Sequence, residues 1–245
     1  MRHIRLVLPL CCAMLGAADG LPPDAAFVQP QGEDLVLDGK PVRFWGFIGP
    51  TSTGGFAWAP KPAADDAPEV RQRKVAAMNA TTDFYIARIA ALGFDLVRTW
   101  ERCDWSAAWQ PGDGSAPDQL GYYWAALDRA GIRQWWTGGN HLGGISLADA
   151  ERLAPGDAGR PFREAIASMI EAAGARAKAR GDKRYAAGMV DIRGAYYEYW
   201  DERLQAIHLE RLTQAATWRN LHKPGAPRLV DDPQIVVWEL ANEEW

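Results

Sequence analysis

A carboxylic acid that follows an apolar segment is the feature of this sequence that most directly suggests chemistry. Residues 235–240 are a run of β-forming, mostly apolar side chains, and Asn242-Glu243 follow it. A carboxylic acid at the carboxyl end of a strand can donate a proton to a bound ligand and later accept one from water. The competing interpretation is a surface glutamate at a frayed chain end, with Asn242 capping the strand.

Two further side chains suit a ligand site. Arg98 ends a predicted strand, and a cation inside a folded chain needs an anion beside it. That anion belongs either to a site or to a structural salt bridge, with Glu239 or Asp104 as the partner. His141 lies in the Gly-rich loop after the next predicted strand, where it either contacts a ligand or is solvated. We assign no role to Glu239 itself.

The remaining histidines and the cysteines suggest no site. His208 lies on an apolar helical stripe and is expected in the core, whereas His222 is expected at the surface. No His/Cys group has metal-ligand spacing, and the sequence contains no P-loop or dinucleotide-binding glycine pattern. We therefore expect no metal and no organic cofactor. Cys103 would be the single cysteine left after leader removal, which excludes an internal disulfide and suits a small packing residue.

The first 18 residues have the pattern of a secretory signal peptide. A basic start with Arg2 and Arg5 precedes an apolar stretch and small residues before Asp19. Cys11 and Cys12 suggest a lipoprotein, but Pro9-Leu10 is a poor approach to a lipidated cysteine. We expect residues 19–245 to form the mature, secreted or periplasmic chain.

The composition is that of a soluble globular protein with an unusual number of aromatic side chains. Hydrophobic residues make up 48% and charged residues 24%, and there are 12 tryptophans. The formal net charge of −4 becomes more negative once the leader is removed. This charge argues against a nucleic acid or an anionic membrane surface as the partner.

Turn signals and hydrophobic periodicity divide the chain into alternating strands and helices. Asp38-Gly39 is a two-residue hairpin signal, with a second strand that continues to Phe47. Residues 175–184 are basic and polar and are expected to be a solvated insertion. Gly93 and Gly131 close two helices. The further predicted strands are 94–98, 132–136 and 235–240. Four helices are predicted, the last near 200–218. The apolar stripes of the first three helices are Val75, Met78, Thr82, Ile86 and Ile89; Leu120, Trp124 and Leu127; and Phe162, Ile166, Met169 and Ile170.

This alternation predicts an α/β fold in which parallel strands are joined by helical crossovers. Long loops follow the strands while the returns from helix to strand are short, which suits a (β/α)8 TIM-barrel type with about the first four units present. A doubly wound open sheet is the rival. It lacks support because no phosphate-binding glycine turn follows the first strand.

Three segments resemble the glycoside hydrolases of family 5 and clan A, the cellulase- or mannanase-like enzymes. The segment Leu-Val-Leu-Asp-Gly-Lys-Pro-Val-Arg-Phe-Trp-Gly at 35–46 is similar to their first strands, and Leu-Gly-Phe-Asp-Leu-Val-Arg-Thr-Trp at 92–100 to their second. The segment Asp-Asp-Pro-Gln-Ile-Val-Val-Trp-Glu-Leu-Ala-Asn-Glu at 231–243 is similar to their fourth. The resemblance covers residues 27–245, although Glu244 stands where many members have Pro.

The resemblance implies a retaining β-glycoside hydrolase that acts on a β-glucan, β-mannan or related glycan. Glu243 would be the acid/base, Asn242 would bind the sugar 2-hydroxyl, and Arg98 would hold the nucleophile ionised. His141 would contact substrate. The nucleophile, a glutamate on a seventh strand, has no counterpart here, so these 245 residues alone are expected to be inactive.

Aromatic side chains near the strand ends are the remaining substrate-binding candidates. Trp100 and Trp136, with Trp105 and Trp109, would either stack on sugar rings or lie in the core. An alternative function is a non-catalytic carbohydrate-binding or scaffold protein derived from such a barrel. A transglycosylase of the same clan is a third.

Overall fold

The computed structural model describes residues 26–49, 61–100, 105–137, 144–180, 189–191 and 201–239. The leader at 1–18, His141, Asn242 and Glu243 lie outside these ranges. For Trp100 only the backbone is described.

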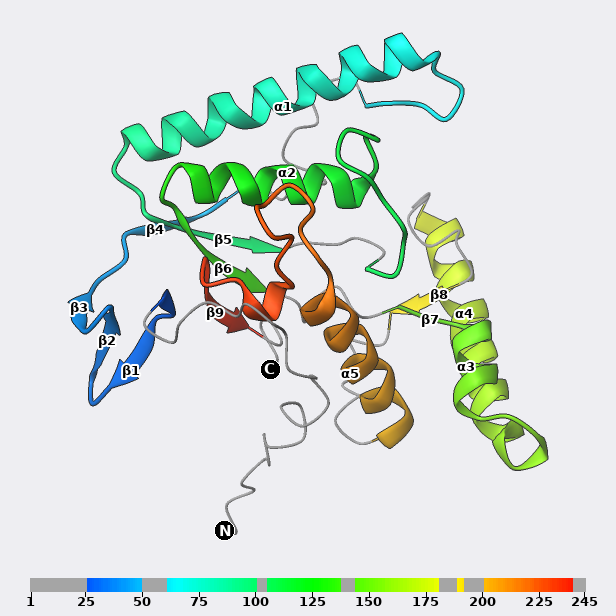
Figure 1. The fold of residues 1–245 in the computed structure, drawn as a ribbon. Helices are drawn as coiled ribbons and strands as arrows, with labels where there is room; N and C mark the ends of the chain where they lie inside the picture. Colours follow the sequence, from blue (N-terminus) through cyan, green and yellow to red (C-terminus); the bar gives the residue numbers. More distant parts are fainter. Residues whose placement is uncertain are drawn as a thin grey trace.

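A four-stranded parallel sheet forms the centre of the described chain (Figure 1). Its strands are β4 (Gly46–Ile48), β5 (Leu96–Trp100), β6 (Arg133–Thr137) and β9 (Ile235–Glu239), and they pair in the order β4-β5-β6-β9. All three pairings are parallel, which confirms the prediction from the alternating elements. The order follows the sequence without a reversal, whereas a doubly wound sheet reverses its strand order at a switch point.

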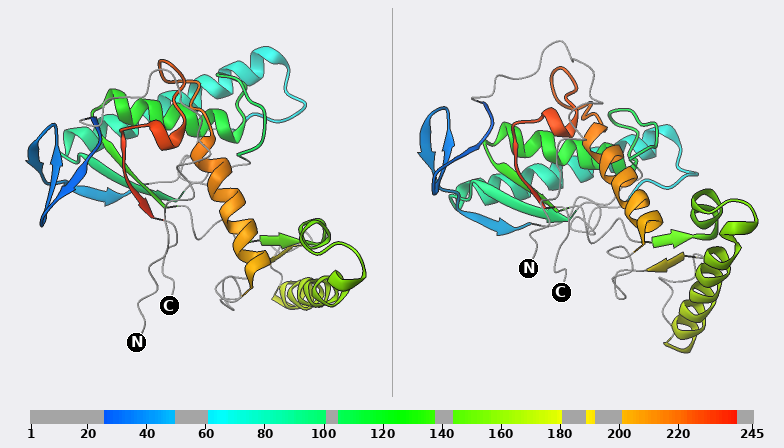
Figure 2. Two further views of the ribbon diagram at one scale, coloured as in Figure 1. Left: turned by 60° about the horizontal axis from the view of Figure 1, so that its bottom comes forward. Right: turned by 90° about the horizontal axis from the view of Figure 1, so that it is seen from below.

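Two of the helices that connect these strands pack on one face of the sheet, and the carboxyl end of the third reaches the same buried cluster. α1 (Pro68–Ala91) lies between β4 and β5 in the sequence, α2 (Ala116–Arg129) between β5 and β6, and α5 (Glu202–Thr217) between β6 and β9. Residues of all three helices share one buried cluster with side chains of the sheet: Ile86, Ile89, Leu120, Trp124, Ala215, Val97 and Trp136. Figure 2 shows α1 and α2 stacked on the same side of the sheet. Crossovers that stay on one side while strands add in one direction produce a barrel wall.

Periodicity predicted the buried side of α1 correctly. Its buried residues are Val75, Met78, Thr82, Ile86 and Ile89, at spacings of three and four that place them on one face. Gly93 follows the helix with a φ of 79°, a backbone conformation that favours glycine. In α2, the Ser115 side chain caps the first turn by accepting a hydrogen bond from the Asp118 amide.

A separate antiparallel sheet precedes β4. It contains β1 (Gln29–Gln31), β2 (Asp34–Leu37) and β3 (Lys40–Val42). Asp38 and Gly39 have φ values of 51° and 69°, as a tight hairpin turn requires, so the predicted hairpin is confirmed. The predicted continuation of its second strand to Phe47 is wrong, because β3 ends at Val42 and Phe47 belongs to the parallel sheet.

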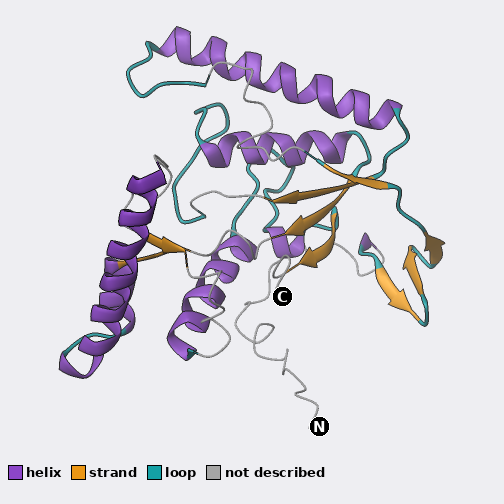
Figure 3. Cartoon of the chain, turned by 180° about the vertical axis from the view of Figure 1, so that it is seen from behind, coloured by secondary structure: helices purple, strands orange, loops and turns teal. Residues whose placement is uncertain are grey.

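A smaller unit lies between β6 and α5 in the sequence and beyond the carboxyl ends of β5 and β6 (Figure 3). It contains α3 (Leu147–Leu153), the 3-10 turn at Asp157–Gly159 and α4 (Arg160–Arg180). Its core includes Phe162 and Ile166 of α4, which pack with Leu204 and Ile207 of α5. The sequence did not predict the pairing of β7 (Gly144–Ser146) with β8 (Met189–Asp191), and residues 175–180 extend α4 instead of forming an insertion. The 3-10 turn Leu229–Asp231 precedes β9.

Candidate active site

Strand alternation places four polar or amphipathic side chains on the face of the sheet opposite α1 and α2. Arg98 is on β5, Trp135 and Thr137 are on β6, and Glu239 is on β9. Their immediate strand neighbours Val97 and Trp136 point the other way into the helix-packed core. We call the side that carries Arg98, Trp135, Thr137 and Glu239 the Arg98 face.

Arg98 and Glu239 form a bidentate ion pair across the Arg98 face. Arg98 Nε donates to Glu239 Oε2 at 2.8 Å, and Arg98 Nη2 donates to Glu239 Oε1 at 2.6 Å. The two side chains are 19% and 20% exposed, so the pair is shielded without being sealed from solvent. Two parallel N–H···O bonds fix the plane of the guanidinium as well as its distance.

Two neighbouring donors complete the environment of the Glu239 carboxylate. Trp135 Nε1 donates to Oε2 at 2.8 Å, and the Thr137 hydroxyl donates to the same oxygen at 2.6 Å. The guanidinium of Arg98 also lies over the Trp135 ring, 5.3 Å from its centroid. A single carboxylate therefore links three adjacent strands.

These contacts decide the charge of Glu239. Partial burial acts to raise the pKa of the carboxyl, but the hydrogen bonds from Arg98 and Thr137 outweigh it, with help from the Arg98 charge and Trp135. The pKa therefore lies below the ordinary glutamate value, and Glu239 is an anion at neutral pH. A carboxylate that is ionised at neutral pH suits charge pairing and is a poor proton donor.

The predicted role of Arg98 can be compared with this geometry. Of the partners that we considered, Glu239 is the one that the structure places against Arg98, while Asp104 lies outside the described residues. Glu239 had been assigned no role, and Trp135 was not considered. The sequence did not reveal that Glu239 and Arg98 share a face, because the register between strands decides this. The consecutive tryptophans of β6 gave no signal either, because one of them lies on each face.

The expectation that Trp136 binds sugar is wrong. Its side chain is fully buried against Trp105 and Trp238, on the sheet side that packs against the helices. It therefore has no face open to a ligand. Trp109 is buried in the same cluster, and Trp105 packs against it, so both are packing residues here.

Of the other candidate residues, the structure describes the backbone of one. The backbone of Trp100 ends β5 and pairs with Thr137. His141, Asn242 and Glu243 remain predictions, because they lie outside the described residues. His208 is half-buried on α5, next to the buried Ile207.

The expectation that His222 lies at the surface is wrong. Its Nε2 lies 2.7 Å from Oδ1 of the buried Asp118, and its side chain is only 15% exposed. Its ring also contacts Trp109 and Tyr122.

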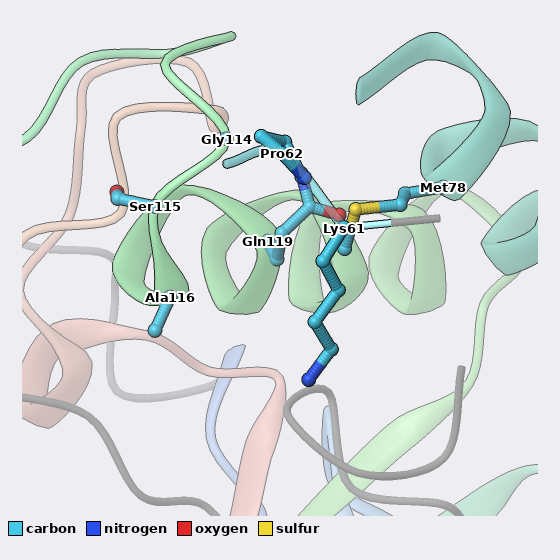
Figure 4. A pocket seen from close by; sticks show the side chains of 7 residues that line it. All are labelled: Lys61, Pro62, Met78, Gly114, Ser115, Ala116 and Gln119. Atoms are coloured by element: carbon cyan, nitrogen blue, oxygen red, sulfur yellow. The ribbon is translucent and has the colours of Figure 1, made fainter. Parts of the chain in front are cut away.

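A cavity of about 140 Å³ lies elsewhere, between α1 and the first turn of α2 (Figure 4). It is lined by Lys61, Pro62, Met78, Gly114, Ser115, Ala116 and Gln119. It is separate from the Arg98 face and contains no carboxylate in its lining, so it is not the candidate site. Within the described ranges, no three His, Cys, Asp or Glu side chains gather in a way that could hold a metal ion. The helices of those ranges also include none with the length and apolar character needed to cross a membrane.

Comparison with known proteins gives one structural likeness. No family model and no curated protein matches the chain. A solved endo-1,4-β-mannanase from Rhizomucor miehei is similar over 89% of this chain and 48% of its own, with 18% identity and a TM-score of 0.43. The chain thus spans about half the length of that protein. A likeness of this degree assigns neither a family nor an activity.

Proposed function

We propose that the protein is a retaining β-glycoside hydrolase in which the parallel sheet is one wall of a (β/α) barrel. The observation that carries this proposal is the packing of α1, α2 and the carboxyl end of α5 on one side of the sheet. Such packing leaves the Arg98 face, with its fixed ion pair, toward the inside of the wall. The strand β9, at the end of that series, leads in the sequence to Asn242-Glu243.

In this proposal the chemistry belongs to Glu243. It would protonate the leaving oxygen and later act as base for the attacking water, while Asn242 would bind the 2-hydroxyl of the sugar. Glu243 comes four positions after Glu239, a multiple of the two-residue period of a strand. His141 and Trp100 would contact an oligo- or polysaccharide substrate, a β-glucan, β-mannan or related glycan.

Glu239 does not suit the second catalytic carboxylate. If the extended backbone of β9 continued to Glu243, four residues would span about 13 Å, whereas the two carboxyl groups of a retaining enzyme lie about 5–5.5 Å apart. Oε2 of Glu239 also already accepts three hydrogen bonds, which lowers its reactivity as a nucleophile. The proposed nucleophile is therefore a carboxylate other than Glu239, the one carboxylate on the four described strands of the parallel sheet.

Because these 245 residues alone are expected to be inactive, the test measures hydrolysis of β-mannan and β-glucan oligosaccharides by a protein that joins them to a strand with the nucleophile. We expect Glu243→Gln to lower kcat by about 10²–10⁴-fold, because the amide cannot deliver a proton. Glu244→Gln, one residue further on, serves as the matched control and should keep most of the activity. Equal activity in the wild type and Glu243→Gln would refute the assigned role.

Binding measurements separate this function from a non-catalytic sugar-binding protein. Titration calorimetry with the same oligosaccharides would show binding without turnover in the wild type if the protein only binds sugars. Products in which the glycosyl group has been transferred to an acceptor sugar instead of to water would indicate a transglycosylase. We also propose secretion through the leader at 1–18, which amino-terminal sequencing of the mature protein would test.

A further inference from the structure

The helix α5 belongs to two buried clusters. Leu204 and Ile207, in its first half, pack in the core of the smaller unit. Ala215, in its last turn, is buried in the cluster that α1, α2 and the sheet share. Steps of three and eight residues place these three side chains on one side of the helix. One face of a single helix is therefore buried in both cores, and Figure 1 shows α5 running between the smaller unit and the sheet.

Two charged pairs join the middle of α5 to α3 of the smaller unit. Arg152 Nη2 lies 2.7 Å from Glu210 Oε2, and Arg211 Nη2 lies 3.5 Å from Asp149 Oδ2. Glu210 and Arg211 are neighbours on α5, and each meets the opposite charge on α3. A slide of one helix along the other would break both pairs. Each partly exposed pair contributes little to stability, but together they favour one register of the two helices.

These contacts hold the smaller unit at the end of the sheet where a ligand would approach. Figure 3 shows the unit beyond the carboxyl ends of β5 and β6, and parallel sheets bind their ligands at those ends. A unit in this position is either a lid, which opens and closes, or a fixed wall. Opening would require α5 to bend between its two buried parts or would pull Ala215 out of its buried cluster.

We propose that the smaller unit is a fixed wall of the ligand site, with its position set by α5 as one rigid helix between the two cores. The 16 residues of α5 include no proline and no glycine, residues at which many helices kink. Withdrawal of Ala215 and Trp218 from the buried cluster would expose apolar surface to water. The proposal holds whichever ligand the protein binds, so it does not depend on the proposed hydrolysis.

A distance measurement between the two cores tests the fixed position. Spin labels at Ala76→Cys on α1 and Ala172→Cys on α4 are both exposed, and the three native cysteines are replaced by serine. Pulsed electron resonance should then give one population of distances between the labels. Two separate populations, as an opening lid produces, would overturn the proposal.

Variants of Leu209 show whether α5 sets this distance. Leu209 is 57% exposed and lies between the two buried parts of the helix. Leu209→Pro should kink α5 and change or broaden the distance distribution, because proline removes a helical hydrogen bond. Leu209→Ala shortens the same side chain without breaking the helix and is the matched control. An unchanged distribution in Leu209→Pro would show that α5 does not fix the unit.

Hydrogen exchange tests the coupling without labels and replaces the proline variant if that variant does not fold. The slowest amides around Phe162 and Ile166 in α4 and around Leu120 and Leu127 in α2 should open together. Leu209→Gly, which weakens the shared helix, should raise the exchange rates of both sets by the same factor, about fivefold. An increase confined to α4 would show that the smaller unit opens by itself and would refute the fixed wall.

Discussion

His222 and Asp118 lie 104 positions apart in the sequence and meet with Nε2 2.7 Å from Oδ1. The contact joins the loop after α5 to the first turn of α2. Asp118 also accepts hydrogen bonds from the amides of Gly112 and Gly114, each at 2.8 Å. One buried carboxylate thus organises two loops on the helix side of the sheet.

Replacement of Asp118 tests how much this junction stabilises the fold. Asp118→Asn should lower the free energy of unfolding by about 3 kcal/mol, because it removes one partner of a buried charged contact and turns an amide group toward backbone donors. Urea denaturation measures the loss. Asp157→Asn is the control, since Asp157 pairs with Arg160 on the exposed surface and should leave stability unchanged. A loss in Asp118→Asn as small as in the control would show that the junction is not structural.

Stability should fall in acid because of Asp118 and Glu239. Burial raises the pKa of the Asp118 carboxyl, but hydrogen bonds from His222 and the two glycine amides outweigh it, and the pKa lies below its ordinary value. The pKa of Glu239 is lowered as well. A carboxyl with a depressed folded-state pKa contributes stability that is fully present above its unfolded value, about 4, and is lost as pH falls through the folded value.

Denaturation at a series of pH values measures this dependence. Asp118→Asn should flatten the slope of stability against pH below about pH 4. An identical slope in the wild type and the variant would show that Asp118 does not bind protons differently in the folded and unfolded states.

Trp135 and Trp136 should respond differently to substitution although they are neighbours. Trp136→Ala should cost about 3–5 kcal/mol of stability, because it leaves a cavity in the core. Trp135→Phe keeps a ring beside Arg98 and loses only the hydrogen bond to Glu239, so about 1 kcal/mol is expected. Urea denaturation of both variants decides the assignment of the two faces, and the reverse order of losses would contradict it.

Substitution of two helical glycines by alanine should change the stability of the protein in opposite directions. In Gly121→Ala the new Cβ would lie 2.9 Å from both Asn220 Oδ1 and Trp109 Cη2, and we expect a loss of about 1–3 kcal/mol. Gly174, inside α4, has no atom within 4 Å of an added Cβ. Gly174→Ala should therefore stabilise by about 0.5–1 kcal/mol through higher helix propensity. Thermal unfolding of both variants checks the difference.

Features that depend on neighbouring positions were read correctly from the sequence. The stripe of α1 follows from the 3.6-residue period, and the hairpin at Asp38-Gly39 follows from the positive φ values that its turn requires. The parallel order of the strands followed from the alternation of elements. The residues after β9 remain a prediction of the sequence, because Asn242 and Glu243 lie outside the described ranges.

Features that depend on partners far away in the sequence were not predicted from it. The side to which each tryptophan of β6 points was undetermined, because alternation fixes only that neighbours face opposite ways. His222 was assigned to the surface because nothing near it in the sequence indicates Asp118. The pairing of β7 with β8 was missed because both are short and have no strong alternating pattern.

The sequence by itself determined the alternating elements, the hairpin, the buried stripe of α1 and the resemblance that suggested Glu243 as an acid, because each depends on local spacing or on a contiguous motif. Only the tertiary structure decided that Arg98 is paired with Glu239, 141 positions away, and that Trp135 rather than Trp136 shares its face. The physical reason is that the register of three parallel strands brings these side chains together.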